Sequence, residues 1–538
     1  MRRSSKRPHR TLVGLRPWLI LAMITGMGAT ATAELYNPDL VCRPIAPELT
    51  PHERLRALSF DLRGIPPTME EYSTVTELGA VPANLVGEWL YTDAFKAQII
   101  RLHRSMFWNE LNNLRLGHNR MRLSKASGIW WRRDQARTYR GGADRHRCLN
   151  QPATYTSDGE LEFAYFVDEF GQEVRQEGYV ELSPYWAPND VVKVCALDAQ
   201  DVLIGDEGTD CATRANWSDS SCGCGPEMRW CLPDAASAKV LSGFEDDLDR
   251  RVAWMLDGNK SYDAMLTEAP AFINGPISHY LRHQAQFGGS LQLAPMPFPM
   301  LQIPVIDYSA NNTWIGIELT SSHSGALSSP AFLLRFQTNR ARASKFSTEF
   351  LCDPYVAPSG GLPPTTDEEA MEPDLQKRAG CKYCHARLEP TASYWGRFPE
   401  SGAGLLSKED YPAFSPECEA CALKTGPCPS LCSKYVTKAE VDSEEAYFGW
   451  LKQSLFIKPN ALGFIDQGPA ALVKRSIVDQ KLPMCVTRKM ASWLFGRGLH
   501  PSESAWLDEV AQNFAVSGLN LRELIRTLAT SPMYGAVR

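Results

Sequence analysis

The sequence predicts a mainly α protein that carries a small β-containing, cysteine-rich insert. Apolar residues recur at helical spacing near both ends of the chain, for example at Leu55, Leu58 and Leu62. Residues 150–205 differ, because aromatic and β-branched residues there stand in short runs separated by Gly, Pro and Asp, which is typical of short strands. A chain of 538 residues is also long enough for several domains with their own cores. We therefore expect a multidomain helical body.

The expected elements divide the chain into six segments. Helical runs over 48–115 are interrupted at Ile65-Pro66-Pro67-Thr68, since proline cannot continue a helix. Helical spacing returns from about 236, and a Pro- and Gly-rich stretch at 353–365 has the composition of a linker. Near the carboxy terminus, one helix should end at Gly518 before another begins. The segments are a signal peptide at 1–33, an N-terminal helical domain at 34–130, the Cys-rich insert at 131–235, a helical domain at 236–352, a segment with a second Cys cluster at 353–465 and a C-terminal helical domain at 466–538.

The amino terminus has the three parts of a secretory signal peptide. Six basic residues precede an apolar centre at 18–24, and Ala31-Thr32-Ala33 forms a small-residue cleavage site, so we expect cleavage after Ala33. The apolar centre is far shorter than the roughly 20 residues of a membrane-spanning helix. The mature chain is therefore expected in the periplasm, the cell envelope or the extracellular space, with no transmembrane segment after cleavage.

The charge balance speaks against a nucleic-acid-binding surface. The full chain has 56 Lys and Arg against 62 Asp and Glu, and the leader contains six of the basic residues and none of the acidic ones. The mature chain then has 50 basic and 62 acidic residues, a net charge of −12. Such a surface does not attract a polyphosphate chain, so we expect no nucleic acid among the partners.

Five residues, Cys381-Lys382-Tyr383-Cys384-His385, form the CxxCH attachment motif of c-type heme. The two thiols can each add to one vinyl group of a porphyrin, and the adjacent imidazole can bind the iron from the same turn. With 15 Cys and 10 His in 538 residues, random placement gives about 0.008 such strings per chain. We therefore expect one covalent heme c in a cytochrome-c-like segment, with His385 as the proximal iron ligand. A disulfide between Cys381 and Cys384 and a paired metal thiolate are the alternatives.

The motif leaves the sixth iron ligand open. Met484 is the first candidate for the distal ligand, because His/Met ligation is common in cytochromes c, although any single Met is more often a core residue. The second ring nitrogen of His385 should donate to a backbone carbonyl, for which Pro390 is a candidate. The rivals of Met484 are Met490, His103 and His323, each with a structural role as its alternative.

The other 13 cysteines are expected to form mainly disulfides, because an exported protein meets an oxidising environment. The clusters at 222–231 and 418–432 contain close cysteine pairs that could bind zinc, but outside the cytoplasm disulfides are favoured. An odd number leaves at least one thiol without an intramolecular disulfide partner. Neither cluster is followed by His, so neither predicts a second heme.

Several stretches together resemble a known family. They are 54–72 (RLRALSFDLRGIPPTMEEY), 262–276, 323–346, the CxxCH motif and 495–534. Their order is similar to that in exported multidomain proteins of planctomycetes and myxobacteria, the planctomycete-type cytochrome c domain proteins. The resemblance covers most of the mature chain except the insert, where this sequence departs from the family's pattern. It implies a heme-bearing, extracytoplasmic protein of a largely uncharacterised family, some of whose members are associated with sulfatase-like partners.

Electron transfer is the function that these features predict. No catalytic residue is assigned, because the chain has no GxSxG nucleophile elbow, P-loop or dinucleotide-binding GxGxxG. We expect an electron carrier or redox subunit rather than a stand-alone enzyme, docking a redox partner that the sequence does not identify. The alternatives are a heme enzyme of peroxidase or oxidase type, with an open iron position, and a disulfide-stapled envelope binding protein in which the heme is structural or absent.

Overall fold

The computed structural model describes residues 49–535. Within that range it leaves out 113, 133–146, 168–170, 172, 207, 220, 288–301, 321–322, 357–365, 367–370, 373, 401, 425, 440–441 and 452–458. The predicted signal peptide and Cys42 lie outside the described residues, as does most of the predicted linker at 353–365.

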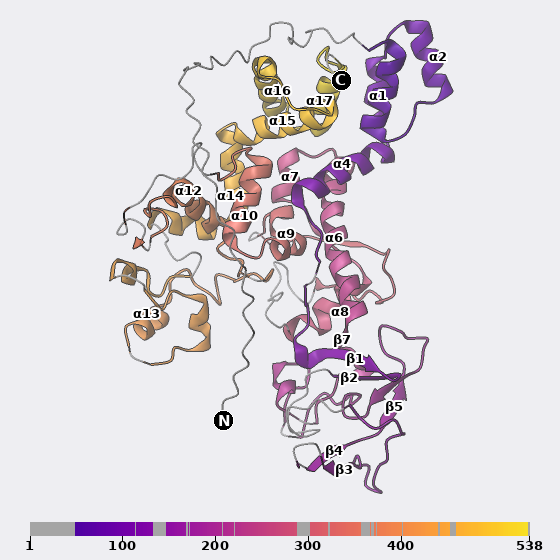
Figure 1. Cartoon of the computed structure of the whole chain (residues 1–538), viewed down its shortest axis with the longest axis vertical. Coiled ribbons are helices and arrows are strands. Elements are labelled where there is room, and N and C mark those ends of the chain that lie inside the picture. Colours follow the sequence, from indigo (N-terminus) through magenta and orange to yellow (C-terminus); the bar gives the residue numbers. More distant parts are fainter. Residues whose placement is uncertain are drawn as a thin grey trace, which may run out of the picture. The chain divides into compact units, whose positions relative to one another are not determined.

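The predicted mainly α architecture is confirmed, and its first helices begin and end at local sequence signals (Figure 1). Thr50 caps the first helix in a capping box with Glu53, and Gly64, with a φ of 71°, ends it. After the predicted break, Thr68 caps the next helix in the same way. The helices of this region are α1 (Pro51–Arg63), α2 (Met69–Leu78), α3 (Ala83–Trp89) and α4 (Asp93–Phe107).

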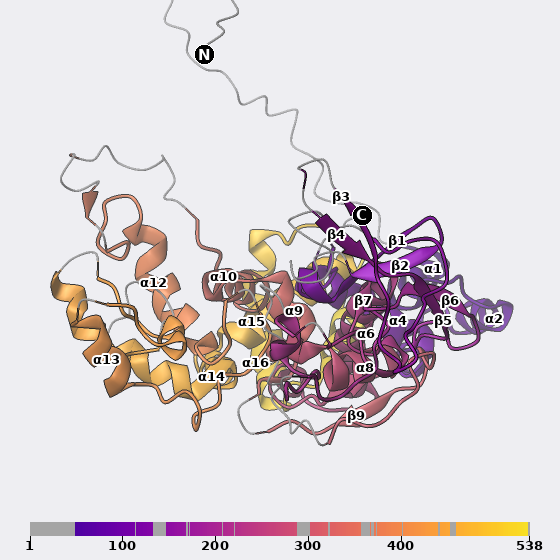
Figure 2. The same cartoon turned by 90° about the horizontal axis from the view of Figure 1, so that it is seen from below.

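The insert is a small sheet with an attached ribbon, as its sequence predicts. Its strands are β1 (Arg122–Ala126), β2 (Ile129–Arg132), β3 (Ala164–Val167), β4 (Glu173–Gln176), β5 (Tyr179–Leu182), β6 (Val192–Cys195) and β7 (Leu232–Pro233). Five of them pair in the order β5-β6-β2-β1-β7, which Figure 2 shows grouped together, while β3 and β4 form a separate antiparallel ribbon. The sheet begins at Arg122, so the segment boundary that the sequence places at 130 falls inside β2.

Helices return directly after the insert. They are α6 (Asp234–Asp257), α7 (Tyr262–Thr267), α8 (Gly275–His283), α9 (Pro330–Arg335) and α10 (Asn339–Phe350), and the strands β8 (Ala271–Ile273) and β9 (Ile315–Ile317) pair beside them. α6 is the centre of this region, because α4, α7, α8 and α9 all pack against it.

The last part of the described chain is again helical. Its helices are α12 (Lys382–Ala392), α13 (Pro416–Ala422), α14 (Pro459–Val478), α15 (Lys481–Phe495), α16 (Ser504–Val516) and α17 (Leu521–Thr530). α15, α16 and α17 pack on one another, and the apolar stripes predicted for α16 and α17 are buried. Gly518 has a φ of 75° just after α16, and Asn520 caps α17, so the predicted boundary between these helices is confirmed.

One apolar core joins the helical regions. It contains buried residues from near each end of the described chain and from between them, such as Leu55, Phe244, Trp395 and Leu528. From Glu48 onward the chain forms one compact unit, and the helical segments distinguished in the sequence share this core. Smaller clusters form inside the insert and around Cys418 and Cys432. None of the helices in the described ranges has the length and apolar character needed to span a bilayer.

Candidate heme-attachment site

The CxxCH residues form the first turn of α12. Cys381 is the N-cap residue, and the backbone N–H groups of Cys384 and His385 donate to the Cys381 carbonyl oxygen at 3.1 and 3.0 Å. Residues three and four apart lie on one face of a helix, so the two thiols and the imidazole face the same side. All three side chains are partly exposed. This turn therefore presents the attachment groups together on an accessible face.

Cys381 and Cys384 are the two described cysteines that form no disulfide. The other twelve described cysteines are all paired, which confirms the disulfides predicted for both clusters. The pairs are Cys148–Cys195, Cys211–Cys222, Cys224–Cys231, Cys352–Cys485, Cys418–Cys432 and Cys421–Cys428. The two cysteines of the motif are thus outside any disulfide, whereas all other described cysteines form one.

A buried carboxylate orients His385, the residue that the sequence predicts as proximal ligand. The Nδ1 of His385 lies 2.6 Å from Oε1 of Glu389, one turn further along α12, and the Nε of Arg340 on α10 donates to the same oxygen at 2.7 Å. A carboxylate accepts hydrogen bonds only, so Nδ1 of His385 is the donor in this contact. The Pro390 carbonyl expected from the sequence is not the acceptor. The sequence signal for Glu389 is its position four residues after His385, a spacing that places two side chains on one face of a helix.

Contacts with α10 and the residues after it fix α12 in place. The carboxylate of Asp353 pairs with Arg387 at 2.8 Å, and the hydroxyl of Tyr355 lies within hydrogen-bonding distance of both Ser347 on α10 and Thr391 on α12. On its inner side, the buried Leu388 of α12 belongs to the shared core. The heme-motif helix is therefore held on both sides, and its first turn is left accessible.

Met484 lies on α15, partly buried, one residue before the disulfide-bonded Cys485. The first residue of α15, Lys481, shares Asp353 with Arg387 of α12. Side chains two residues apart on a helix point to nearly opposite sides, so the Arg387 side chain faces away from that of His385. The described contacts do not bring Met484 to the side of α12 that carries His385. Its role as distal ligand stays a prediction.

The rivals of Met484 have structural surroundings. Met490 is fully buried in the core. His103 is buried on α4, with Nδ1 at 2.8 Å from the Ile99 carbonyl and Nε2 at 3.1 Å from the Tyr262 hydroxyl, so both its nitrogens are engaged. His323 accepts a hydrogen bond from the Gly325 N–H through Nδ1. Of these three side chains, none is placed as a free iron ligand.

Because several histidines lose hydration in the folded state, we expect the free energy of unfolding to fall in acid. Burial lowers the pKa of His103 from 6.5 to about 4, because the charged ring would lose its hydration. The folded-state pKa lies below the unfolded one, so the stabilisation is complete above pH 6.5 and is lost as pH falls toward 4. For His103, the difference between the unfolded and the folded pKa corresponds to about 3 kcal/mol of unfolding free energy. Burial also lowers the pKa of His279, to about 3, and that of His323, to about 4, with the same sign.

Urea unfolding at pH 7 and pH 5 measures this effect. The midpoint of the wild-type protein should fall at pH 5, and the difference in unfolding free energy between the two pH values should be smaller in His103→Gln. His52→Gln is the matched control, since His52 lies exposed on α1. The same pH difference in both variants would contradict the assignment to His103.

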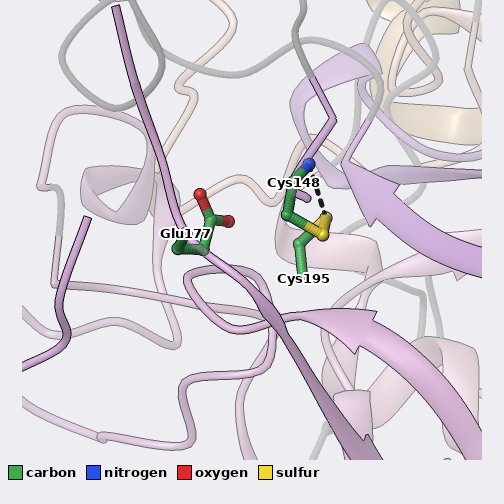
Figure 3. Close-up of side chains that lie close together, drawn as sticks. All are labelled: Cys148, Glu177 and Cys195. Carbon is green, nitrogen blue, oxygen red and sulfur yellow. Dashed lines mark hydrogen bonds between the residues drawn. A yellow bond between two sulfur atoms is a disulfide. The ribbon is translucent and has the colours of Figure 1, made fainter. Parts of the chain in front are cut away.

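A second cluster of potential metal ligands lies in the insert (Figure 3). Ligand atoms of Cys148, Glu177 and Cys195 lie within 4.8 Å of one another, and all three side chains are buried. The two sulfur atoms form a disulfide, however, and the Cys148 N–H donates to the sulfur of Cys195 at 3.2 Å. A disulfide offers no thiolate, so this cluster is a structural staple in the oxidised protein.

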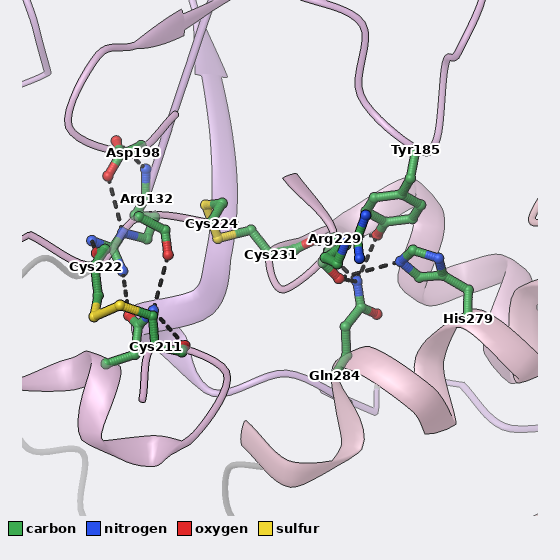
Figure 4. Close-up of a disulfide and its surroundings, with 12 residues drawn as sticks. Arg132, Tyr185, Asp198, Cys211, Cys222, Cys224, Arg229, Cys231, His279 and Gln284 are labelled. Atoms are coloured by element: carbon green, nitrogen blue, oxygen red, sulfur yellow. Dashed lines mark hydrogen bonds and ion pairs between the residues drawn. A yellow bond between two sulfur atoms is a disulfide. The ribbon is translucent and has the colours of Figure 1, made fainter. Parts of the chain in front are cut away.

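The polar groups around the other insert disulfides are also structural (Figure 4). Arg132 is buried and donates to Asp198 at 3.0 Å, and a further hydrogen bond reaches the carbonyl of Cys222. On the side of the Cys224–Cys231 disulfide, the Gln284 amide donates to the Tyr185 hydroxyl at 2.9 Å and to the Cys231 carbonyl at 3.1 Å. These bonds satisfy buried polar groups and fix the loop conformation.

The described chain is thus a mainly α, disulfide-bonded protein with an accessible CxxCH turn. Comparison with protein-family models, with curated proteins and with solved structures finds no match. The resemblance to planctomycete-type cytochrome c domain proteins accordingly remains an expectation from the sequence. The residues present nevertheless suit heme c, because two described thiols outside any disulfide and an imidazole that donates through Nδ1 share one helical turn.

Proposed function

We propose that this chain is an exported c-type heme protein that acts in electron transfer. When bound, the heme supplies a one-electron Fe(III)/Fe(II) couple. The observation that carries the proposal is the CxxCH turn, in which the two described cysteines outside any disulfide precede an oriented histidine. Cys381 and Cys384 would bind the porphyrin through thioether bonds, and His385 would bind the iron through Nε2.

The surrounding residues support this role. Glu389 holds the imidazole in the orientation and tautomer that leave Nε2 free, and the contacts of Asp353 and Tyr355 fix the helix. Six disulfides support an oxidising compartment, which is where thioether attachment takes place. The protein would act in the periplasm or cell envelope with a redox partner, for which a sulfatase-like neighbour is the candidate that the resemblance offers.

Covalent heme tests the proposal. The protein should be produced in a host with a cytochrome c maturation system, and a pyridine hemochrome spectrum recorded after denaturation. We expect a c-type band from the wild type and none from Cys381→Ala/Cys384→Ala. The matched control is Cys421→Ala/Cys428→Ala, which also removes two cysteines but should keep the band, because these residues form a disulfide. A wild type without heme would end the proposal.

The native holoprotein, before denaturation, tests the sixth ligand. If Met484 closes the iron, the reduced wild-type protein should not bind carbon monoxide, whereas Met484→Ala should bind it. Carbon monoxide binding by the wild type would favour the enzyme alternative over electron transfer.

A further inference from the structure

The group that accepts the hydrogen bond from His385 is a side-chain carboxylate, whereas the sequence predicts a backbone carbonyl. A backbone carbonyl is neutral, whereas the Glu389 carboxylate carries a negative charge 2.6 Å from the ring nitrogen. The Glu389 side chain is 1% exposed, so water screens this charge little. Its second oxygen, Oε2, is buried and has no hydrogen-bond partner within the described residues. The Glu389 carboxylate therefore interacts with two groups, His385 and Arg340.

Arg340 offsets this charge only in part. Its Nε donates to the shared Oε1 at 2.7 Å, but its side chain is 33% exposed, so the guanidinium charge is more strongly screened than the carboxylate. Arg340 and His385 both reach Oε1, and the Nδ1 contact is present at 2.6 Å beside that of Arg340. The imidazole thus donates into an anionic acceptor, which shifts electron density toward Nε2 and strengthens it as an iron ligand.

We propose that Glu389 gives the proximal histidine an anionic character and thereby lowers the reduction potential of the heme. The inference rests on the proposed function. A more basic axial ligand stabilises Fe(III) relative to Fe(II), since the higher charge on the metal gains more from the added electron density. The reduced protein then loses its one electron readily to an acceptor of higher potential. Glu389 is a positioning and tuning residue.

Redox titration of the full-length holoprotein tests the inference. Glu389→Gln keeps an oxygen acceptor for Nδ1 and removes the charge. Glu389→Asp keeps the charge. Glu409→Gln is the matched control, because it removes one carboxylate from an exposed position. Heme per chain is measured first by pyridine hemochrome, so that failure of the proposed function, seen as a wild type without heme, is separated from failure of the inference.

The expected result is a tenfold higher Fe(II)/Fe(III) ratio in Glu389→Gln than in the wild type at the same ambient potential, which is 59 mV for a one-electron couple. Glu389→Asp should stay closer to the wild type, and Glu409→Gln should be unchanged. An unchanged ratio in Glu389→Gln at equal heme content overturns the inference, as does an equal shift in Glu409→Gln. If Glu389→Gln does not fold, Arg340→Gln replaces it. Removing the counter-charge should lower the ratio, and a raised or unchanged ratio overturns the inference.

Discussion

Replacing both Cys352 and Cys485 by alanine should lower the free energy of unfolding by about 5 kcal/mol. This disulfide joins residues 133 apart, the largest separation among the six described pairs, and the loss of loop-closure entropy in the unfolded chain grows with that separation. It ties the end of α10 to α15. Urea unfolding monitored by far-UV circular dichroism measures the change.

The Cys421→Ala/Cys428→Ala variant is the matched comparison. That disulfide spans only 7 residues, so the same relation gives a loss of about 2 kcal/mol. Equal losses in the two variants would contradict the loop-closure explanation. Because α10 also carries Arg340, the Cys352/Cys485 variant should in addition weaken the support of Glu389, which a lower yield of covalent heme would report.

Arg342→Met should be nearly as damaging, with an expected loss of about 4 kcal/mol or more. The Arg342 side chain is fully buried in α10, and burial lowers its pKa to about 9, which leaves it charged at neutral pH. Methionine fills similar space but donates no hydrogen bond, so several buried carbonyls would lose their partner. The acceptors are the carbonyl oxygens of Leu333, Phe336, Phe398, Pro399 and Gly402 and the side-chain oxygen of Asn339.

These six acceptors lie in two segments, one before α12 in sequence and one after it. Three of them precede or begin α10 and three follow Trp395, and Arg342 holds both segments together. Arg101→Met is the control, since Arg101 lies exposed on α4. Urea midpoints that differ little between the two variants would contradict a structural role for Arg342.

Local signals explain what could be predicted from the sequence. Thr50 with Glu53, Gly64 and the two prolines after it define the ends of α1, because capping and φ restrictions act within a few residues. The strands of the insert follow from runs of aromatic and β-branched residues. The preference for disulfides over zinc at 418–432 follows from the compartment that the leader implies, and both pairs in this cluster are close in sequence.

The sequence by itself determined the helical class, the β insert and the CxxCH turn, because each depends on neighbours along the chain. Only the tertiary structure decided that Cys352 pairs with Cys485, that His103 is engaged between Ile99 and Tyr262, and that Arg340 meets Glu389. The Cys352–Cys485, His103–Tyr262 and Arg340–Glu389 contacts join residues 133, 159 and 49 positions apart, so they depend on how the helices pack. The site of His385 shows both kinds of contact: Glu389 stands four residues along the same helix, which is a local spacing, whereas the second partner of that carboxylate, Arg340, comes from α10 and depends on packing.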